Sequence, residues 1–600
     1  MTPRPVLLPA LCSAALFLVY GALLRLLRQV KYKAAPAQRA LTAGDWGSAA
    51  LGGILVGGLG SLHPLGAVPA ALLGTLSLWL LWLDAALYRL FSFELGLGGV
   101  GGVVLSNLYQ EVAKMDTARR FFRSHRAFAL APAAILGAHL VLLLPAGSGA
   151  QLTLSGALAA YLVWAHAPTP EPTSAVRPAR LRRALLHDFL RPRRPRVPAR
   201  FQPRPEHAFL LAQQPALPSP SAHHGVLAGR SVVLLTFESL SAAHLADPPP
   251  DKTQGRAQAQ VQNRAWTPFL DSLRAAAVAS AHHCCLAPLT NCAHLALYSS
   301  QAAAPPGPWH LQPLHRAGYR SLYLTAATVE HYGLAGILRR AGFQHVLDAR
   351  VLAPHPGDGG CISDRALLVD GLRRLRQLLG APGGPFFLHV HAANTHIPYR
   401  VADRSRFCYH DLQSDRGRFL SGIEESDWLF GELFAALRSL CAEQAAGEPL
   451  LVVSSDHGQS FGEGGYFSHG SAVRHEQLSV PLLLSHPRLA APAPRFSTHF
   501  DVLPTILDLL GLAAEQPGFG TSIFNTERQI GHLLWDGQPT RPTSTCLGLQ
   551  LAQRKIALDL ARGTCIESDW HDGDARLLSD GEHDYFEALL GALARHRGVQ

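Results

Sequence analysis

The chain has 600 residues, of which 48% are hydrophobic, and its formal net charge is +10. A chain of this length is expected to form several domains and can bury a large core. Much of the positive charge lies in one proline-rich segment, which argues against nucleic-acid binding as the main function.

Residues 1–168 have the composition of a membrane domain. The apolar run 6–27 is long enough to cross a bilayer and lacks the cleavage site of a removable signal peptide. Residues 49–90 are long enough for two spans separated by a glycine- and proline-containing break, and further spans are expected near 128–145 and 152–167. We therefore predict five transmembrane helices, with the two ends of this domain on opposite sides of the membrane.

Two features of the sequence predict opposite locations for the rest of the chain. The basic loops 25–39 and 114–126 fall on the side of the C-terminal domain, and the positive-inside rule would make that side cytoplasmic. Residues 91–122 mix apolar and charged side chains, however, and are compatible with interfacial helices whose arginines contact anionic lipid on either face. Eight of the nine cysteines follow residue 280, which is compatible with disulfides in an oxidising compartment.

Residues 169–225 are predicted to form a linker. Proline recurs throughout, and ten arginines lie between Arg177 and Arg204. This composition cannot bury a core, so we expect a semi-rigid segment held against the membrane surface, with a short helix at 180–190. A solvated basic spacer fits the composition equally well.

Residues 226–600 are assigned to one α/β domain. Short apolar runs rich in branched side chains alternate with helical stretches, which is typical of a doubly wound sheet. One helix is expected to begin at Pro268 with Thr267 as its cap. The predicted strands are 231–237, 322–325, 385–391, 449–453 and 480–484.

Polar residues follow two of these strands. Asp456 and His457 come after strand 449–453, and Glu238 follows strand 231–237. The carboxyl ends of parallel strands meet at one edge of a sheet, where ligands bind. Asp456 and His457 can therefore present an oxygen and a nitrogen to one metal ion, although a capped turn is the simpler interpretation of that pair alone.

An ordered set of motifs resembles the alkaline phosphatase and sulfatase superfamily. The motifs are Glu238-Ser239, Thr290-Asn291, His396-Ile397-Pro398-Tyr399, Ser455-Asp456-His457-Gly458, His469-Gly470, Val480-Pro481 and His499 to Thr505. The membrane branch, with lipoteichoic acid synthases and lipid A phosphoethanolamine transferases, also has five spans before an extracytoplasmic catalytic domain. The resemblance covers the spans and roughly residues 230–512. It implies an alkaline-phosphatase-like domain outside the cytoplasmic (inner) membrane.

Two differences from the sulfatase pattern favour the phosphotransferase branch of the superfamily. Sulfatases carry a Cys/Ser-x-Pro-x-Arg signature, whereas the aligned stretch here, 290–294, lacks both the proline and the arginine. Glu238 is also a single acid where sulfatases usually have paired aspartates. Both features resemble the phosphotransferases, in which a threonine is the nucleophile.

The resemblance implies one metal site and a threonine nucleophile. The implied ligands are Glu238, Thr290, Asp456 and His457. Their oxygens and single nitrogen suit Zn²⁺ or, alternatively, Mn²⁺. Coordination would let the Thr290 hydroxyl lose its proton near neutral pH. His396 and His469 would contact the phosphoryl group or protonate the leaving oxygen.

Each of these residues also has an ordinary structural interpretation. Thr290 could cap the helix that follows it, and Glu238 could be a plain strand-end carboxylate. His396 and His469 could lie outside any site. Cys292, two residues from Thr290, is a rival nucleophile.

The sequence thus predicts a membrane-bound, monomeric phosphotransferase. Its donor would be a membrane phospholipid, and it would move a phosphoethanolamine or phosphoglycerol headgroup to an envelope glycan or lipid, with no nucleic-acid partner. A sulfatase-like hydrolase or phosphodiesterase that uses water as the acceptor is the alternative. A catalytically silent binding protein on the same fold is the third hypothesis.

Overall fold

The computed structural model describes residues 194–599, without 246–265, 306–308, 310, 331–332, 354–360, 381–383, 409, 491–493, 526–530, 537–543 and 561–562. The five predicted transmembrane helices and the predicted helix 180–190 lie outside the described residues. Within the described part, we find no helix that combines the length and the apolar character needed to cross a bilayer.

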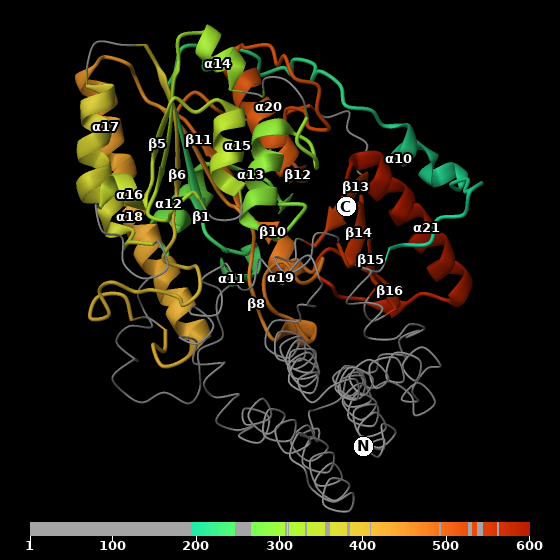
Figure 1. The fold of residues 1–600 in the computed structure, drawn as a ribbon. Helices are drawn as coiled ribbons and strands as arrows, with labels where there is room; N and C mark the ends of the chain where they lie inside the picture. Colours follow the sequence, from blue (N-terminus) through green and yellow to red (C-terminus); the bar gives the residue numbers. More distant parts are fainter. Residues whose placement is uncertain are drawn as a thin grey trace, which may run out of the picture.

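A seven-stranded sheet forms the centre of the described structure (Figure 1). Strands β7, β1, β6, β4 and β5 run parallel, and β11 runs antiparallel to its neighbours β7 and β2. In sheet order the strands are β2 (Val278–Ala279), β11 (Leu482–Ser485), β7 (Leu450–Ser455), β1 (Val232–Phe237), β6 (Phe386–His391), β4 (Arg320–Thr325) and β5 (His345–Leu347).

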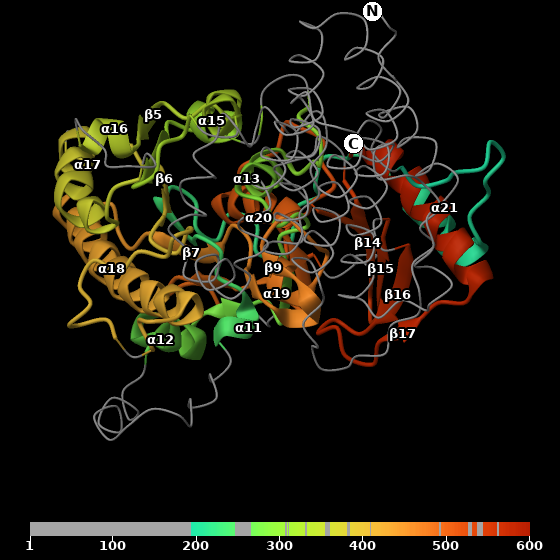
Figure 2. The same ribbon diagram turned by 60° about the horizontal axis from the view of Figure 1, so that its bottom comes forward.

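Helices cover both faces of this sheet (Figures 1 and 2). Side chains alternate along β1, so Val233 and Leu235 join one core cluster and Val232 and Leu234 join the other. The first face is covered by α12 (Pro268–Ala276), α17 (Leu372–Leu379) and α18 (Asp415–Glu443), and the second by α13 (Thr290–Ser299), α14 (Gln312–Arg316), α15 (Leu334–Ala341) and α20 (His499–Leu510). Burial on both faces explains why these strands are continuous apolar runs.

The predicted doubly wound domain is confirmed, with one change at the sheet edge. The predicted strand 480–484 is divided at Pro481, which cannot donate a ladder hydrogen bond. Its first part, β10 (Ser479–Val480), instead joins β3 (His282–Cys284) and β12 (Phe496–Thr498) in a small second sheet. Thr267 does precede α12, but its side chain makes no capping hydrogen bond.

Shorter elements connect these layers. They are α11 (Ala242–Leu245), α16 (Ala349–Leu352), the π-helical turn η5 (Leu367–Gly371), β8 (Ser460–Phe461), η6 (Glu463–Gly465), β9 (Phe467–Ser468) and α19 (His475–Leu478).

A five-stranded antiparallel sheet follows the α/β domain along the chain, and the sequence reasoning missed it. We call this sheet and its helix the C-terminal layer (Figure 2). Its elements are β13 (Gly531–Trp535), β14 (Cys546–Leu551), β15 (Lys555–Asp559), β16 (Thr564–Ser568), β17 (Arg576–Leu577) and α21 (Asp580–Arg597). Ser579 and Glu582 form a capping box that begins α21. Buried Leu589 and Leu590 of this helix share a core with Leu549 and Leu558 of the sheet.

Part of the predicted linker packs on the C-terminal layer. The backbone N–H of Arg196 donates to Glu587 at 2.9 Å, and the guanidinium of Arg204 lies 4.0 Å from the centre of the Tyr585 ring. The segment then forms η3 (Pro205–His207) and α10 (Ala208–Ala212), which contacts α21.

The cysteines give no support for the predicted disulfides. Cys284, Cys285, Cys292, Cys408, Cys441 and Cys565 have free thiols. The extracytoplasmic location of the domain therefore stays a prediction, and disulfide bonds do not support it.

The packing of α21 generates the first prediction. Leu589 is fully buried between α21 and the sheet. Leu589→Ala should lower the free energy of unfolding by about 2–5 kcal/mol, because it leaves a cavity in a close-packed core. Arg595→Ala, at an exposed position of the same helix, should change it by less than about 0.5 kcal/mol. Thermal unfolding of the detergent-purified protein measures both, and equal melting temperatures for the two variants would show that α21 does not stabilise the fold.

Candidate active site

Three adjacent parallel strands bring polar residues to one edge of the main sheet. β1 lies between β6 and β7, and its Thr236 is in register with His391 of β6 and Ser454 of β7. Glu238 lies two residues beyond Thr236, and Asp456 lies two residues beyond Ser454, so both follow at the same edge. The prediction that these two carboxylates share an edge is confirmed.

The turns after β1 and β7 are joined by a hydrogen bond. Ser239 has a positive φ of 65°, and in this conformation its N–H donates to Asp456 Oδ1 at 2.9 Å while its hydroxyl donates to Glu238 Oε1 at 2.8 Å. A left-handed serine at this point is the kind of strain that functional sites retain. Gly458 is required for another reason: a Cβ there would lie 2.2 Å from the carbonyl oxygen of Glu476.

Two carboxylates and two imidazoles converge at these turns. Glu238 and His391 are each 3% exposed, and Asp456 and His457 are fully buried. His391 Nε2 lies 3.2 Å from Glu238 Oε2 and 3.9 Å from Asp456 Oδ2. His457 Nε2 lies 3.3 Å from Asp456 Oδ2 and 3.6 Å from Glu238 Oε1. We call these four residues the acidic cluster.

The side chains of the acidic cluster shift one another's pKa values. Burial and the neighbouring Glu238 carboxylate raise the pKa of Asp456 to about 8. Burial alone would raise the pKa of Glu238 too, but its hydrogen bond with His391 and the nearby His457 hold it well below its usual value. Burial disfavours charge on His391, yet the two carboxylates raise the pKa of its imidazole. Two buried carboxylates this close need a cation between them.

The acidic cluster fits a divalent metal ion. Ligand atoms of Glu238, His391 and Asp456 all lie within 4.8 Å of one another. Asp456 Oδ2 is buried and accepts no hydrogen bond from the described residues, so a coordination bond would satisfy it. Carboxylate oxygens and imidazole nitrogens are ligands suited to Zn²⁺ or Mn²⁺.

Thr290 is the first residue of α13 and faces this cluster. Its hydroxyl lies 3.3 Å from His457 Nε2, and the residue is only partly buried. The N-cap position is occupied by Leu289, and no side chain caps the helix. The capping explanation of Thr290 is therefore wrong, and its hydroxyl is available at the cluster.

The Cys292 thiol, unlike the Thr290 hydroxyl, does not face the acidic cluster. Its thiol packs among residues of the C-terminal layer core and hydrogen-bonds with the Trp535 side chain. Burial raises the pKa of the Cys292 thiol to about 11. The thiolate is the nucleophilic form of cysteine, so Cys292 is a poor rival to Thr290 at neutral pH.

The two other predicted histidines lie beside the acidic cluster. The ring of His469 is 4.2 Å from that of His457, and its Nδ1 hydrogen-bonds with Gln459 Oε1 at 2.8 Å. Burial lowers the pKa of His469 well below its usual value. The His396 ring is 6.2 Å from that of His469, and its Nδ1–H donates to the carbonyl of Ile397 at 2.9 Å. The structure thus brings all six predicted site residues together.

Sequence reasoning missed His391. It belongs to a hydrogen-bonded row below the acidic cluster, in which His391 Nδ1 lies 2.9 Å and His389 Nε2 lies 2.7 Å from Thr236 Oγ1. His389 Nδ1 in turn hydrogen-bonds with the hydroxyl of Tyr298. The available signal was the pair His389 and His391 in a buried strand, because residues two apart share one face of a sheet.

Other histidines near the strand ends stay outside the cluster. His282 and His283 point apart, as their adjacency on a strand predicts: His282 stacks on Trp570, and His283 Nδ1 lies 2.8 Å from Ser497 Oγ. His499 Nε2 donates to the backbone carbonyl of Ser455 at 3.0 Å, and burial lowers its pKa to about 3. They are therefore held by structural contacts of their own.

Comparison with protein families agrees with the fold. Residues 231–512 match the family model for sulfatases. These residues form a sulfatase-family domain. The match runs from β1 to just beyond α20 and includes every residue of the candidate site, whereas the C-terminal layer lies outside it. The sequence resemblance to the alkaline phosphatase and sulfatase superfamily, a superfamily of enzymes, is thereby confirmed.

The domain is similar to several solved structures. Lipoteichoic acid synthase LtaP from Listeria monocytogenes is 17% identical, with a TM-score of 0.48 over 64% of this chain and 95% of that one. The C-terminal periplasmic domain of EcEptC from Escherichia coli is 16% identical, with a TM-score of 0.41 over 57% and 97%. Phosphonate monoester hydrolase SpPMH from Silicibacter pomeroyi is 17% identical, with a TM-score of 0.43 over 62% and 95%. A comparison with curated protein sequences finds no match.

The raised pKa of Asp456 generates the second prediction. The folded, metal-free protein holds a proton on Asp456 up to about pH 8, whereas an unfolded aspartate releases it near about pH 4. The folded state binds more protons in this window, so its stability falls as the pH rises. The melting temperature of the metal-free wild type should therefore fall relative to that of Asp456→Asn between about pH 5 and 8.

Metal supplies the control for this measurement. Zn²⁺ should raise the melting temperature of the wild type most at the alkaline end of the range, where Asp456 would otherwise be charged and unpaired. If the melting temperatures of the metal-free wild type and Asp456→Asn changed in parallel with pH, the raised pKa of Asp456 in this cluster would be contradicted.

Proposed function

We propose that the protein is a membrane-bound, metal-dependent phosphotransferase that moves a phosphoethanolamine or phosphoglycerol headgroup from a phospholipid to an envelope glycan or lipid. The observation that carries this proposal is the position of Thr290. Its partly exposed hydroxyl stands 3.3 Å from His457 Nε2 at the edge of a buried acidic cluster. A hydroxyl in this position can attack a phosphoryl group that reaches the cluster.

The identity of the nucleophile distinguishes the proposed enzyme from a sulfatase. The cysteine or serine that sulfatases convert to formylglycine is replaced here by Thr290, whose branched side chain cannot give that aldehyde. Cys292 is turned toward Trp535 and carries a protonated thiol. The chemistry left to the domain is direct attack by a threonine.

In the first half of the reaction, Thr290 Oγ1 forms a bond to phosphorus and the bond from phosphorus to the diacylglycerol oxygen breaks. Glu238, Asp456, His457 and Thr290 are the proposed metal ligands, and the position of His391 makes it a further candidate. A bound divalent cation would lower the pKa of the threonine hydroxyl and neutralise charge on the phosphoryl oxygens. The leaving oxygen takes up a proton and departs as diacylglycerol, and the headgroup phosphate stays on Thr290.

In the second half, an acceptor hydroxyl attacks the same phosphorus and releases Thr290. His469 is placed to take the acceptor's proton, because its Nδ1–H is committed to Gln459 Oε1 and its lowered pKa keeps Nε2 unprotonated at neutral pH. His396 supplies a second imidazole beside the site for the phosphoryl group. Whether the acceptor is a glycan, a lipid or water decides between a transferase and a hydrolase.

The predicted membrane domain favours a lipid donor. Residues 1–168 would place the site beside the bilayer, and a donor in the outer leaflet requires the sulfatase-family domain to face outside. The proposed partners are therefore a membrane phospholipid and an acceptor of the cell envelope, with the protein in the cytoplasmic membrane.

Replacement of the nucleophile tests the function. Thr290→Ala should reduce diacylglycerol release and headgroup transfer at least about 10³-fold, because the attacking oxygen is removed. Cys292→Ala, two residues away, should keep activity within about tenfold. The assay follows diacylglycerol release from labelled phospholipid together with the masses of surface glycans.

Two results would change the proposal. Undiminished transfer by Thr290→Ala would remove Thr290 as the nucleophile. Diacylglycerol release that yields only free phosphoethanolamine or glycerol phosphate, with no modified glycan or lipid, would make the protein a hydrolase.

Topology generates a further prediction. A fluorescent reporter that matures only in the cytoplasm should stay dark when fused after Gln600, whereas an alkaline phosphatase reporter at the same position should be active. These results are expected because the donor and acceptor lie outside. A bright fluorescent fusion would place the domain in the cytoplasm, as the charges of loops 25–39 and 114–126 predict.

A further inference from the structure

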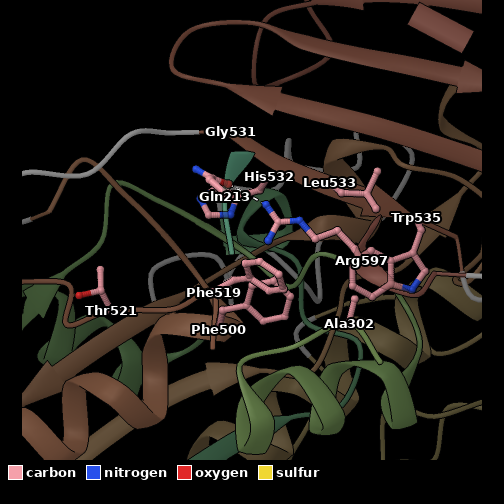
Figure 3. Close-up of a pocket in the computed structure, with 10 residues that line it drawn as sticks. All are labelled: Gln213, Ala302, Phe500, Phe519, Thr521, Gly531, His532, Leu533, Trp535 and Arg597. Atoms are coloured by element: carbon pink, nitrogen blue, oxygen red, sulfur yellow. Dashed lines mark hydrogen bonds between the residues drawn. The ribbon is translucent and has the colours of Figure 1, made fainter. Parts of the chain in front are cut away.

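A cavity of about 150 Å³ lies where several parts of the chain meet (Figure 3). The sulfatase-family domain contributes Phe500, the loop after α20 contributes Phe519, and β13 contributes Leu533. The wall also includes Gln213, just after α10, and Arg597, the last residue of α21. The cavity thus combines an aromatic floor with one cationic side chain.

Arg597 has few partners among the described residues. Its guanidinium carbon lies 3.4 Å from the centre of the Phe519 ring, and its Nη2 donates to Gln213 Oε1 at 2.7 Å. Nη1 is buried and makes no hydrogen bond with the described residues. Among those residues no carboxylate forms an ion pair with Arg597. The cation is therefore held by one neutral amide and one aromatic ring.

Such a cation is costly to bury without an anion. Burial lowers the pKa of Arg597 to about 10, which still leaves it protonated at neutral pH. Its planar donors match the geometry of a carboxylate or phosphate, and the rings of Phe500 and Phe519 offer an apolar surface beside it. A cavity of about 150 Å³ is large enough for a benzene-sized group.

We propose that this cavity binds a small organic anion, with its carboxylate or phosphate on Arg597 and its apolar part over Phe500 and Phe519. The site is separate from the candidate active site. The cavity wall also includes Ala302, three residues beyond the end of α13, whereas Thr290 begins that helix. A ten-residue helix is about 15 Å long, so the length of α13 separates the Ala302 part of the wall from Thr290.

The test uses the full-length protein purified in detergent, with benzoate as the anionic probe and benzyl alcohol as its neutral counterpart. Titration calorimetry and ligand-observed NMR should show benzoate binding to the wild type at least about tenfold more tightly than benzyl alcohol. Arg597→Met should weaken benzoate binding by about 10- to 150-fold, as expected for a lost hydrogen bond to a charged group. Arg595→Met, which changes an exposed arginine of the same helix, should bind benzoate as the wild type does.

A second variant keeps the test decisive if Arg597→Met does not fold. Ala302→Leu adds volume to the wall of the cavity and leaves the guanidinium in place, so it should also block benzoate binding. Phenyl phosphate, compared in the same way, shows whether phosphate can replace the carboxylate. Equal benzoate binding by the wild type, Arg597→Met and Ala302→Leu, or no binding of either anion to the wild type, would overturn the proposal.

Discussion

The site depends on the forced proximity of two buried carboxylates. Glu238 and Asp456 follow adjacent strands that run parallel in fixed register, so neither can move away without breaking the centre of the sheet. Burial and the neighbouring Glu238 carboxylate raise the pKa of Asp456, and its Oδ2 finds no donor among the described residues. A divalent cation is the simplest group that resolves this conflict, and the imidazoles of His391 and His457 stand where they could share it.

Helix α13 and the C-terminal layer determine which side chain lies at the acidic cluster. Helix α13 starts at Thr290 and places the threonine hydroxyl at the acidic cluster. The C-terminal layer covers the next part of the helix and holds the Cys292 thiol in an apolar environment against Trp535. A fold shared with sulfatases is thus combined with a threonine hydroxyl, the proposed nucleophile, so family membership alone does not fix the reaction.

The sequence predicted the elements whose pattern is strong and local. Continuous apolar strands marked the central sheet, and residues such as Glu238 and Asp456 could be placed at one edge because parallel strands end together. His391 was missed because its partner Thr236 lies 155 residues away, and only strand pairing brings them together. The C-terminal layer was missed because its antiparallel strands share a core with α21, an arrangement that no single segment reveals.

The most direct measurement of the central claim is the mass of the enzyme during turnover. The full-length protein, incubated with phospholipid donor and no acceptor, should gain the mass of one phosphoethanolamine or phosphoglycerol group, and peptide mapping should place it on Thr290. The adduct should disappear when acceptor is added. Turnover with no adduct on Thr290, or with the adduct on Cys292 instead, would contradict the account.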